Sequence, residues 1–378
     1  MISSFSLLAL QQYWWLIMSL VASVLVFLLF VQGGQTLIDV LGKNEDEKSM
    51  VINSVGRKWG LTFTVLVVFA AGMFASFPLF YATSFGGAYY AWKIFLISFV
   101  IQAISFEYRR KKGNIYGKRV FEIFLYINGF LGTFLLGVLV STFFTGGEFV
   151  RDAYNSSTWQ NSLHGIEALF NITNIALGLT VMFLARVLGA LYIINSVDDE
   201  VIRTRARKQV VINTIPFLLF FLFFIARLFM MDGYAINPDT KEVFMEPHKY
   251  LNNYLQMPLA LILFLAGVVL VLSGIALSWF KKCNGGVWYS GIGTVLTVLS
   301  LFFVLGYNNT CFYPSSVDIQ SSLSIENASS SHYTLTAMSY ISFFVPVVAT
   351  YIFFTWRAID KAKIKREDMD DNLDQNIY

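Results

Sequence analysis

The feature that most constrains the fold of this chain is a series of long apolar segments. A helix that crosses a bilayer needs about 20 mostly apolar residues, and nine segments of the 378-residue chain meet that requirement. They are Tyr13–Val31, Leu61–Tyr81, Ala88–Phe106, Val120–Phe144, Ile166–Ile194, Val210–Met231, Leu255–Phe280, Val287–Tyr307 and Tyr333–Trp356. The sequence therefore predicts an all-α polytopic membrane protein of nine transmembrane helices, arranged as two four-helix bundles plus one peripheral helix.

Composition agrees with lipid as the main solvent. The chain is 56% hydrophobic and 13% charged, whereas soluble domains are about 45–50% apolar and about 25% charged. Its first segment lacks the charged start and small-residue cleavage site of a signal peptide, so we expect a retained helix. A net charge of +3, without a basic run interleaved with aromatic residues, argues against nucleic acid as a partner.

Lysine and arginine in the connections predict the orientation of the helices. Alternate connections and the C-terminal tail hold 21 of these residues, and the remaining connections hold three, namely Arg151, Lys241 and Lys249. The 21 are Lys43, Lys48, Arg57, Lys58, Arg109, Arg110, Lys111, Lys112, Lys118, Arg119, Arg203, Arg205, Arg207, Lys208, Lys281, Lys282, Arg357, Lys361, Lys363, Lys365 and Arg366. By the positive-inside rule the N-terminus lies outside and the C-terminus lies in the cytoplasm. We expect one membrane domain over residues 1–356 and a charged cytoplasmic tail over residues 357–378.

Charged side chains at membrane depth are the first candidates for function. Glu107 and Glu122 flank the basic connection between the third and fourth helices, so we expect them near the surface, as interfacial charges or as parts of a proton path. Arg186 is close enough to the inner end of its helix to snorkel to the cytoplasm. Lys93 lies ~9 Å below the outer end of the third helix. At this depth its ammonium either snorkels to the outer surface or contacts a partner.

A polar stripe marks the start of the fifth helix. Glu167, Asn171, Asn174 and Gly178 are spaced by four, three and four residues, which places them on one helical face. This face fits a hydrated outer cavity or a contact with a partner subunit. It equally fits packing between helices, since Asn and Gly are common at helix interfaces in membranes.

Residues that bind metals are few in this sequence. The histidines are His164, His248 and His332, all in outer loops or at helix ends, and no Cys-x-x-Cys pair is present. Cys283 and Cys311 lie at opposite ends of one helix, ~40 Å apart, too far to form a disulfide with each other. We therefore expect no catalytic, cofactor-binding or metal-binding residues in this chain.

A series of short motifs resembles subunit II of the cytochrome bd quinol oxidases, in the same order along nearly the whole chain. The most specific piece is the outer loop that begins Tyr313-Pro-Ser-Ser316. The other matching motifs are Val51–Ser54, Trp59, Phe74-Ala75, Pro78, Tyr81, Phe85-x-Gly87, Tyr89, Phe106–Arg109, Gly189–Tyr192, Arg203–Ala206, Asp232–Tyr234, Ser322-Leu323, Ala328–Ser331, Thr334-Leu335, Arg366–Asp368 and Tyr378. Of these we take Trp59, Arg109, Pro314, Ser315 and Ser316 as the family-motif residues.

The resemblance implies a membrane complex that oxidises quinol and reduces dioxygen to water in a bacterial inner membrane. It also implies a partner, subunit I, that carries the quinol site and the haems b and d, while this chain is a non-catalytic subunit that supports subunit I. The rival interpretation is a secondary transporter. Transporters favour ionisable groups near the midplane, and here we expect only Lys93 at depth.

Three departures from the family pattern concern proton delivery. Many members carry acids near the inner end of the first helix, where this chain has Gln32-Gly-Gly-Gln35. Many also have Asp directly after the tryptophan of the first inner loop, whereas here Gly60 follows Trp59. The family's Asn-Pro in the fifth helix is replaced here by Asn171-Ile172. We therefore expect proton uptake, if this chain contributes to it, to involve Glu107 or Glu122. Otherwise it lies wholly in subunit I.

Overall fold

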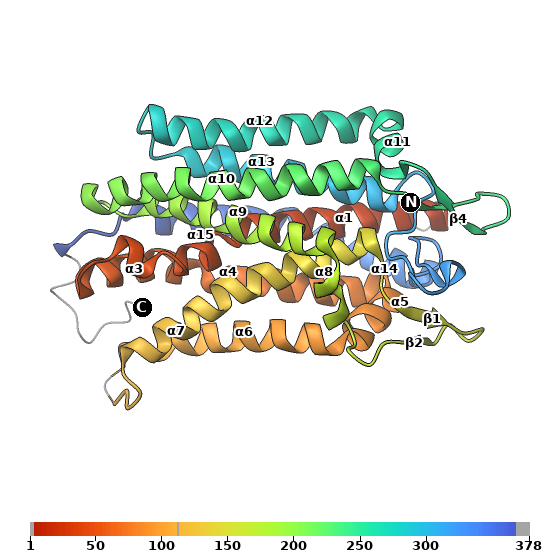
Figure 1. Ribbon diagram of the computed structural model, residues 1–378, viewed down its shortest axis with the longest axis horizontal. Helices are drawn as coiled ribbons and strands as arrows, with labels where there is room; N and C mark the ends of the chain where they lie inside the picture. The colour runs from red at the N-terminus through yellow and green to blue at the C-terminus, as the bar shows by residue number, and fades with distance from the viewer. Residues whose placement is uncertain (1–3, 112, 368–378) are drawn as a thin grey trace.

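The computed structural model describes residues 4–111 and 113–367. Within these ranges nine helical stretches are long and apolar enough to cross a membrane, which confirms the predicted number. They run side by side along the long axis of the molecule (Figure 1). Lys112, Asp368, Tyr378 and the rest of the predicted tail beyond residue 367 lie outside the described residues.

Several of the nine spans consist of more than one helical element. The first four spans and their connections comprise α1 (Leu7–Leu28), α2 (Phe30–Gln35), α3 (Ile38–Leu41), α4 (Glu45–Ser76), α5 (Pro78–Tyr81), the π-helical η2 (Ala82–Gly87), α6 (Tyr89–Tyr108), α7 (Lys118–Ile127), the π-helical η3 (Asn128–Gly132) and α8 (Thr133–Thr145). The last five spans and their connections comprise the 3₁₀-helix η4 (Ile166–Phe170), α9 (Ile172–Ser196), α10 (Glu200–Met230), α11 (Lys249–Gln256), α12 (Pro258–Phe280), α13 (Gly286–Gly306), the 3₁₀-helix η5 (Ile319–Ser321), α14 (His332–Ser342) and α15 (Val345–Lys361).

Two helices begin far earlier than the apolar segments predicted. α4 starts at Glu45 rather than Leu61, and α10 starts at Glu200 rather than Val210. The side chains of Asn44 and Asp199 cap these starts by accepting hydrogen bonds from backbone N–H groups of the first turn. Most basic residues assigned to the first and third inner loops therefore lie on polar extensions of helices, which a search for apolar segments does not detect.

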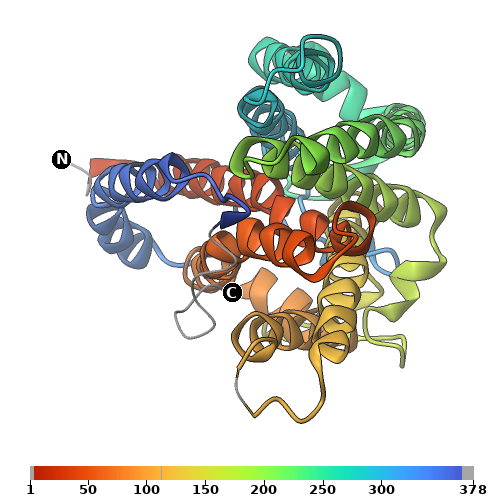
Figure 2. The same cartoon turned by 90° about the vertical axis from the view of Figure 1, so that its left-hand side faces the viewer.

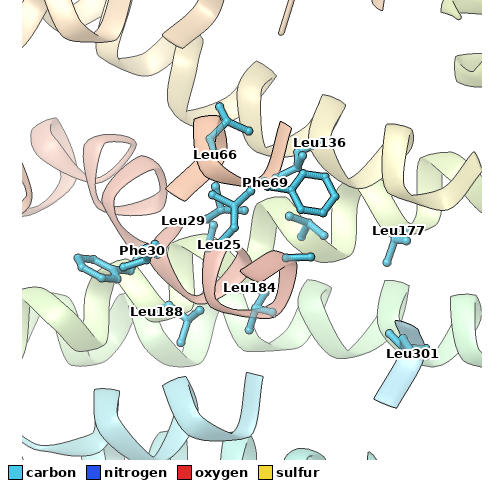
Figure 3. Packing of buried hydrophobic residues seen from close by; sticks show 14 of the residues in the cluster. Leu25, Leu29, Phe30, Leu66, Phe69, Leu136, Leu177, Leu184, Leu188 and Leu301 are labelled. Carbon is cyan, nitrogen blue, oxygen red and sulfur yellow. The ribbon is translucent and has the colours of Figure 1, made fainter. Parts of the chain in front are cut away.

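Close helix contacts through glycine hold the centre of the bundle together. A Cβ on Gly189 of α9 would lie 2.3 Å from the backbone nitrogen of Gly34 on α2. A Cβ on Gly137 of α8 would lie 2.7 Å from the Cα of Gly178 on α9. These contacts permit no side chain and bring α9 against both neighbours. Figure 3 shows buried side chains around this crossing, among them Leu29 and Leu188.

The last span is the least embedded in this chain. Its most apolar stretch is 11% buried, against 78% for the fifth span. Figure 2 shows α14 and α15, in blue, beside the red α1 at one side of the molecule. The sequence predicted one peripheral helix without saying which, and the grouping of the helices into two bundles plus one stays a prediction.

Two short antiparallel hairpins were not predicted. They pair β1 (Phe149–Arg151) with β2 (Ser157–Trp159) and β3 (Gly233–Ile236) with β4 (Val243–Glu246). Both lie at the end of the bundle opposite α3 (Figure 1), and we call this the hairpin end. The other end, which holds α3 and the start of α7, is the basic end. Phe5 lies at the hairpin end and Ile364 at the basic end, as an odd number of spans requires.

Candidate functional site

A buried ion pair lies at the basic end, between α6 and α7. The Arg109 guanidinium, at the C-terminus of α6, donates to Oε1 of Glu122 on α7 over 2.6 and 3.1 Å. Their side chains are only 1% and 2% exposed. Glu122 therefore lies near the basic end of the bundle, but its carboxylate does not face solvent. The turn between α6 and α7 folds Arg109 over it.

Further charges surround this pair. Asp39 on α3 contacts Lys48 at 2.7 Å and Arg119 at 2.6 Å, and both cations also reach Glu122, at 3.6 and 3.2 Å. Burial opposes ionisation of Asp39, but the hydrogen bonds from Lys48 and Arg119 outweigh it and lower the pKa of Asp39 to about 2. The oxygens of Glu122 are thus shared among three cations from three helices.

Deeper in the bundle, a chain of amide side chains joins three helices. Gln102 on α6 donates to Gln35 at 2.7 Å and accepts from Gln32 at 3.3 Å, so it bridges two residues of α2. Gln35 donates to Asn128 of η3 at 3.0 Å, and Asn128 donates to Ser98 at 3.3 Å. From the sequence, Gln32 and Gln35 stood out only as positions without the family's acids. Gln102 and Asn128, two amides in otherwise apolar segments, were the signal that could have predicted this chain of amides.

Arg186 does not snorkel to solvent as predicted. Its guanidinium donates to Asn213 of α10 at 2.6 Å and to the Thr36 hydroxyl at 2.7 Å. It also lies over the Phe130 ring, 5.1 Å from the centroid. Both polar partners come from other segments of the chain, so the residue joins α9 to its neighbours.

A second buried ion pair attaches the last helix. Lys58 of α4 is 2% exposed, and its Nζ lies 3.1 Å from Asp360 on α15. The same carboxylate accepts from the Tyr192 hydroxyl at 3.0 Å and from the Trp356 indole at 2.8 Å. Lys58 was expected in a loop, and Asp360 was not among the candidate residues predicted from the sequence.

Two of the predicted candidates lie on the surface of this chain instead. Glu107 and Lys93 are exposed on α6, and neither has an ion pair with any of the described residues. The ammonium of Lys93 lies over the Tyr89 ring at 4.8 Å from its centroid. The structure therefore separates Glu107, an exposed acid without an ion pair to the described residues, from Glu122, which is held inside an ion network.

Three of the four residues of the predicted polar stripe line a cavity of about 250 Å³ near the hairpin end, and the fourth, Gly178, packs against α8 instead. Glu167, Asn171, Asn174 and Ser316 all line it, but not from one helical face. Glu167 belongs to η4, and Asn171 is the N-cap of α9, so the expected single helix is broken between them. Burial raises the pKa of Glu167.

The remaining family-motif residues have structural contacts. Trp59 stacks on Phe106 with ring centroids 6.1 Å apart. The carbonyl of Pro314 accepts from the backbone of Gly147 at 3.0 Å, and the Ser315 hydroxyl donates to the Phe149 carbonyl. The Pro314–Ser316 segment therefore holds the first hairpin against the end of the bundle.

Gly60 stands where many members of the family have Asp. A Cβ at Gly60 would meet nothing within 4 Å, so the position has room for a side chain.

The histidines, which a haem in the membrane would need as ligands, contact the backbone instead. Ring nitrogens of His164, His248 and His332 lie 2.9–3.1 Å from backbone carbonyls of Gly87, Phe229 and Phe5. All three contacts are near the hairpin end. Among the described residues no group of three His, Cys, Asp or Glu side chains is placed to hold a metal. The histidine donor set of this chain does not fit a haem within the bundle.

The fold and the sites together define a polytopic membrane subunit with internal polar networks and with histidines confined to one end. The model of the cytochrome bd terminal oxidase subunit II family matches residues 10–359. The chain belongs to this family and is a subunit of an oxidoreductase rather than a transporter.

Known proteins of similar sequence and fold agree with this assignment. The chain is 28% identical to the probable cytochrome oxidase subunit 2 of Haemophilus influenzae, over 85% of each chain. It is 26% identical to the cytochrome bd-I ubiquinol oxidase subunit 2 of Escherichia coli K12, over 95% of this chain and 96% of that one. Its fold is similar to that of a chain in the bd oxidase of Geobacillus thermodenitrificans, with a TM-score of 0.63 at 13% identity, covering 93% and 98% of the two chains.

Proposed function

We propose that this chain is the haem-free subunit II of a quinol:dioxygen oxidoreductase in a bacterial inner membrane. Its partner, subunit I, binds haem b, haem d and the quinol. The observation that carries the proposal is the position of the three histidines, whose ring nitrogens contact loop carbonyls at one end. A haem of the complex then needs its histidine ligands from subunit I.

We further propose that this chain delivers no protons through a carboxylate. A carboxylate that relays protons must bind and release them in turn. Uptake by Glu122 would break contacts with Arg109, Arg119 or Lys48. Beyond it, the described polar chain of Gln32, Gln35, Gln102 and Asn128 consists of amides, which neither ionise nor take up a proton near neutral pH.

Expression of this chain with and without subunit I tests the haem assignment. The purified chain alone is expected to show no haem absorbance, and the complex is expected to show b- and d-type spectra. Stoichiometric haem on this chain alone would refute the proposal. Far-UV circular dichroism of the isolated chain serves as the control that it is folded.

A further inference from the structure

A large groove opens between the last helix and the bundle. It has a volume of about 920 Å³ and lies between α1, α13 and α15. Val24 of α1, Ile292 and Val295 of α13 and Ile352 of α15 form part of an apolar wall. The volume is within the range of sites for small organic ligands, and the wall suits hydrocarbon.

Three cations line the same groove toward the basic end. Arg357 and Lys361 belong to the C-terminal part of α15, and Lys363 follows it. None of the three has an ion pair within residues 4–111 and 113–367. The carboxylate that lines the groove, Asp360, is already engaged by Lys58 and by the Tyr192 hydroxyl. The groove therefore has excess positive charge at this end.

Two tryptophans lie where the apolar wall meets the cations. Trp288 and Trp356 have ring centroids 5.8 Å apart, and both line the groove. Tryptophan is enriched at the level of lipid headgroups. From one end to the other, the groove thus presents aliphatic, aromatic and cationic surface, which is the order of acyl chains, glycerol region and phosphate in a phospholipid.

The attachment of the last helix explains why the groove exists. Near the hairpin end, Trp14 donates to Ser339 at 3.0 Å and Tyr13 shares a hydrogen bond with Ser342 at 2.7 Å. At the basic end, Lys58 holds Asp360. The helix is fixed at both ends, and the segment between them stands away from α1 and α13.

We propose that this groove binds one anionic phospholipid, with its acyl chains along α1 and α13 and its phosphate at Arg357, Lys361 and Lys363. Basic pockets between transmembrane helices are suited to anionic headgroups. A neutral quinol can accept hydrogen bonds from these residues but carries no negative charge to balance three cations. The site does not depend on the proposed absence of haem or of a proton path.

The test uses the purified two-subunit complex, delipidated and then titrated with phosphatidylglycerol or phosphatidylcholine, with binding followed by native mass spectrometry. The triple variant Arg357→Gln/Lys361→Gln/Lys363→Gln removes the cations. The matched control, Lys208→Gln/Lys281→Gln/Lys282→Gln, removes three exposed charges at the same end that do not line the groove. A third variant, Ile292→Trp, fills the apolar part and keeps the charges.

We expect the wild type and the control to retain one phosphatidylglycerol in preference to phosphatidylcholine. The triple variant should lose this preference by about tenfold, because each cation near the headgroup contributes to binding. Ile292→Trp should reduce the binding of both lipids. Equal loss in the control, no preference in the wild type, or a quinone lost from the groove variants in place of lipid would each overturn the proposal.

Discussion

Lys58 of α4 and Asp360 of α15 form an ion pair of 3.1 Å that fixes the end of the least buried helix to the bundle. Lys58 is also 4.8 Å from the centroid of the Trp356 ring, one turn before Asp360. Since α15 contributes no buried residue of its own, this polar contact has an unusually large share in its attachment.

The first prediction concerns this pair. Asp360→Asn leaves the Lys58 ammonium buried without a counter-charge, and such a loss costs about 3–5 kcal/mol. The double variant Lys58→Met/Asp360→Asn removes both charges and should recover part of the stability. Thermal unfolding of the complex measures both, with Lys208→Met as an exposed control within about 0.5 kcal/mol of wild type. A double variant less stable than Asp360→Asn would contradict this account.

The second prediction separates the two glutamates. Glu122→Gln removes the main counter-charge of the buried Arg109 and should destabilise the complex by about 3–5 kcal/mol. Glu107→Gln, at an exposed position, should change stability by less than about 0.5 kcal/mol. Dioxygen consumption per haem should stay at the wild-type rate in both variants and in the double variant. A large loss of turnover with intact haem spectra would instead show that a carboxylate of this chain relays protons.

The third prediction concerns acid stability. The pKa of Asp39 is lowered from 3.8 to about 2, so its ion pairs stabilise the fold fully above about pH 4 and are lost as the pH falls through about 2. The stability advantage of the wild type over Asp39→Asn should therefore be constant from about pH 7 to 5 and shrink below about pH 4. Unfolding curves of both proteins across this range test it. A stability advantage of the wild type that grows as the pH falls would contradict this account.

The fourth prediction concerns orientation. Reporters fused after Arg110 and after Lys365 should face the cytoplasm, and one inserted in the Pro314–Ser331 loop should face outside, because basic residues are retained on the inner side. The structure places Arg109 and Ile364 at the same end and Ser315 at the other. This orientation would be contradicted if the reporter after Arg110 and the reporter in the Pro314–Ser331 loop lay on the same side of the membrane.

Much of this fold was predictable because lipid imposes a simple requirement on sequence. Each span needs a long apolar run, and such runs are visible without any knowledge of contacts. The polar extension of α4 from Glu45 was not visible, since a helix in water needs no apolar run. Its start depends on the cap at Asn44, which a hydropathy pattern does not register.

The candidate site was less predictable because its residues acquire their roles from partners distant in sequence. Glu122 was chosen for its charge, but its burial depends on how Arg109 folds over it. Gln102 gains its role by meeting Gln32 and Gln35, which depends on how α2 packs against α6. Asp360 appeared only as one charge in a basic tail. Pairing between helices is information that one sequence does not contain.

The most direct test of the central claim, a subunit that supplies no haem ligand, is the haem content of a complex whose subunit II has no histidine. His164→Asn, His248→Asn and His332→Gln replace each ring with an amide that can bond to the same carbonyl. Asparagine also tolerates the positive φ of His164 and His248. The account predicts wild-type haem content and unchanged b- and d-type spectra in the assembled triple variant. Loss of either haem signal from a complex that still contains both subunits would contradict it.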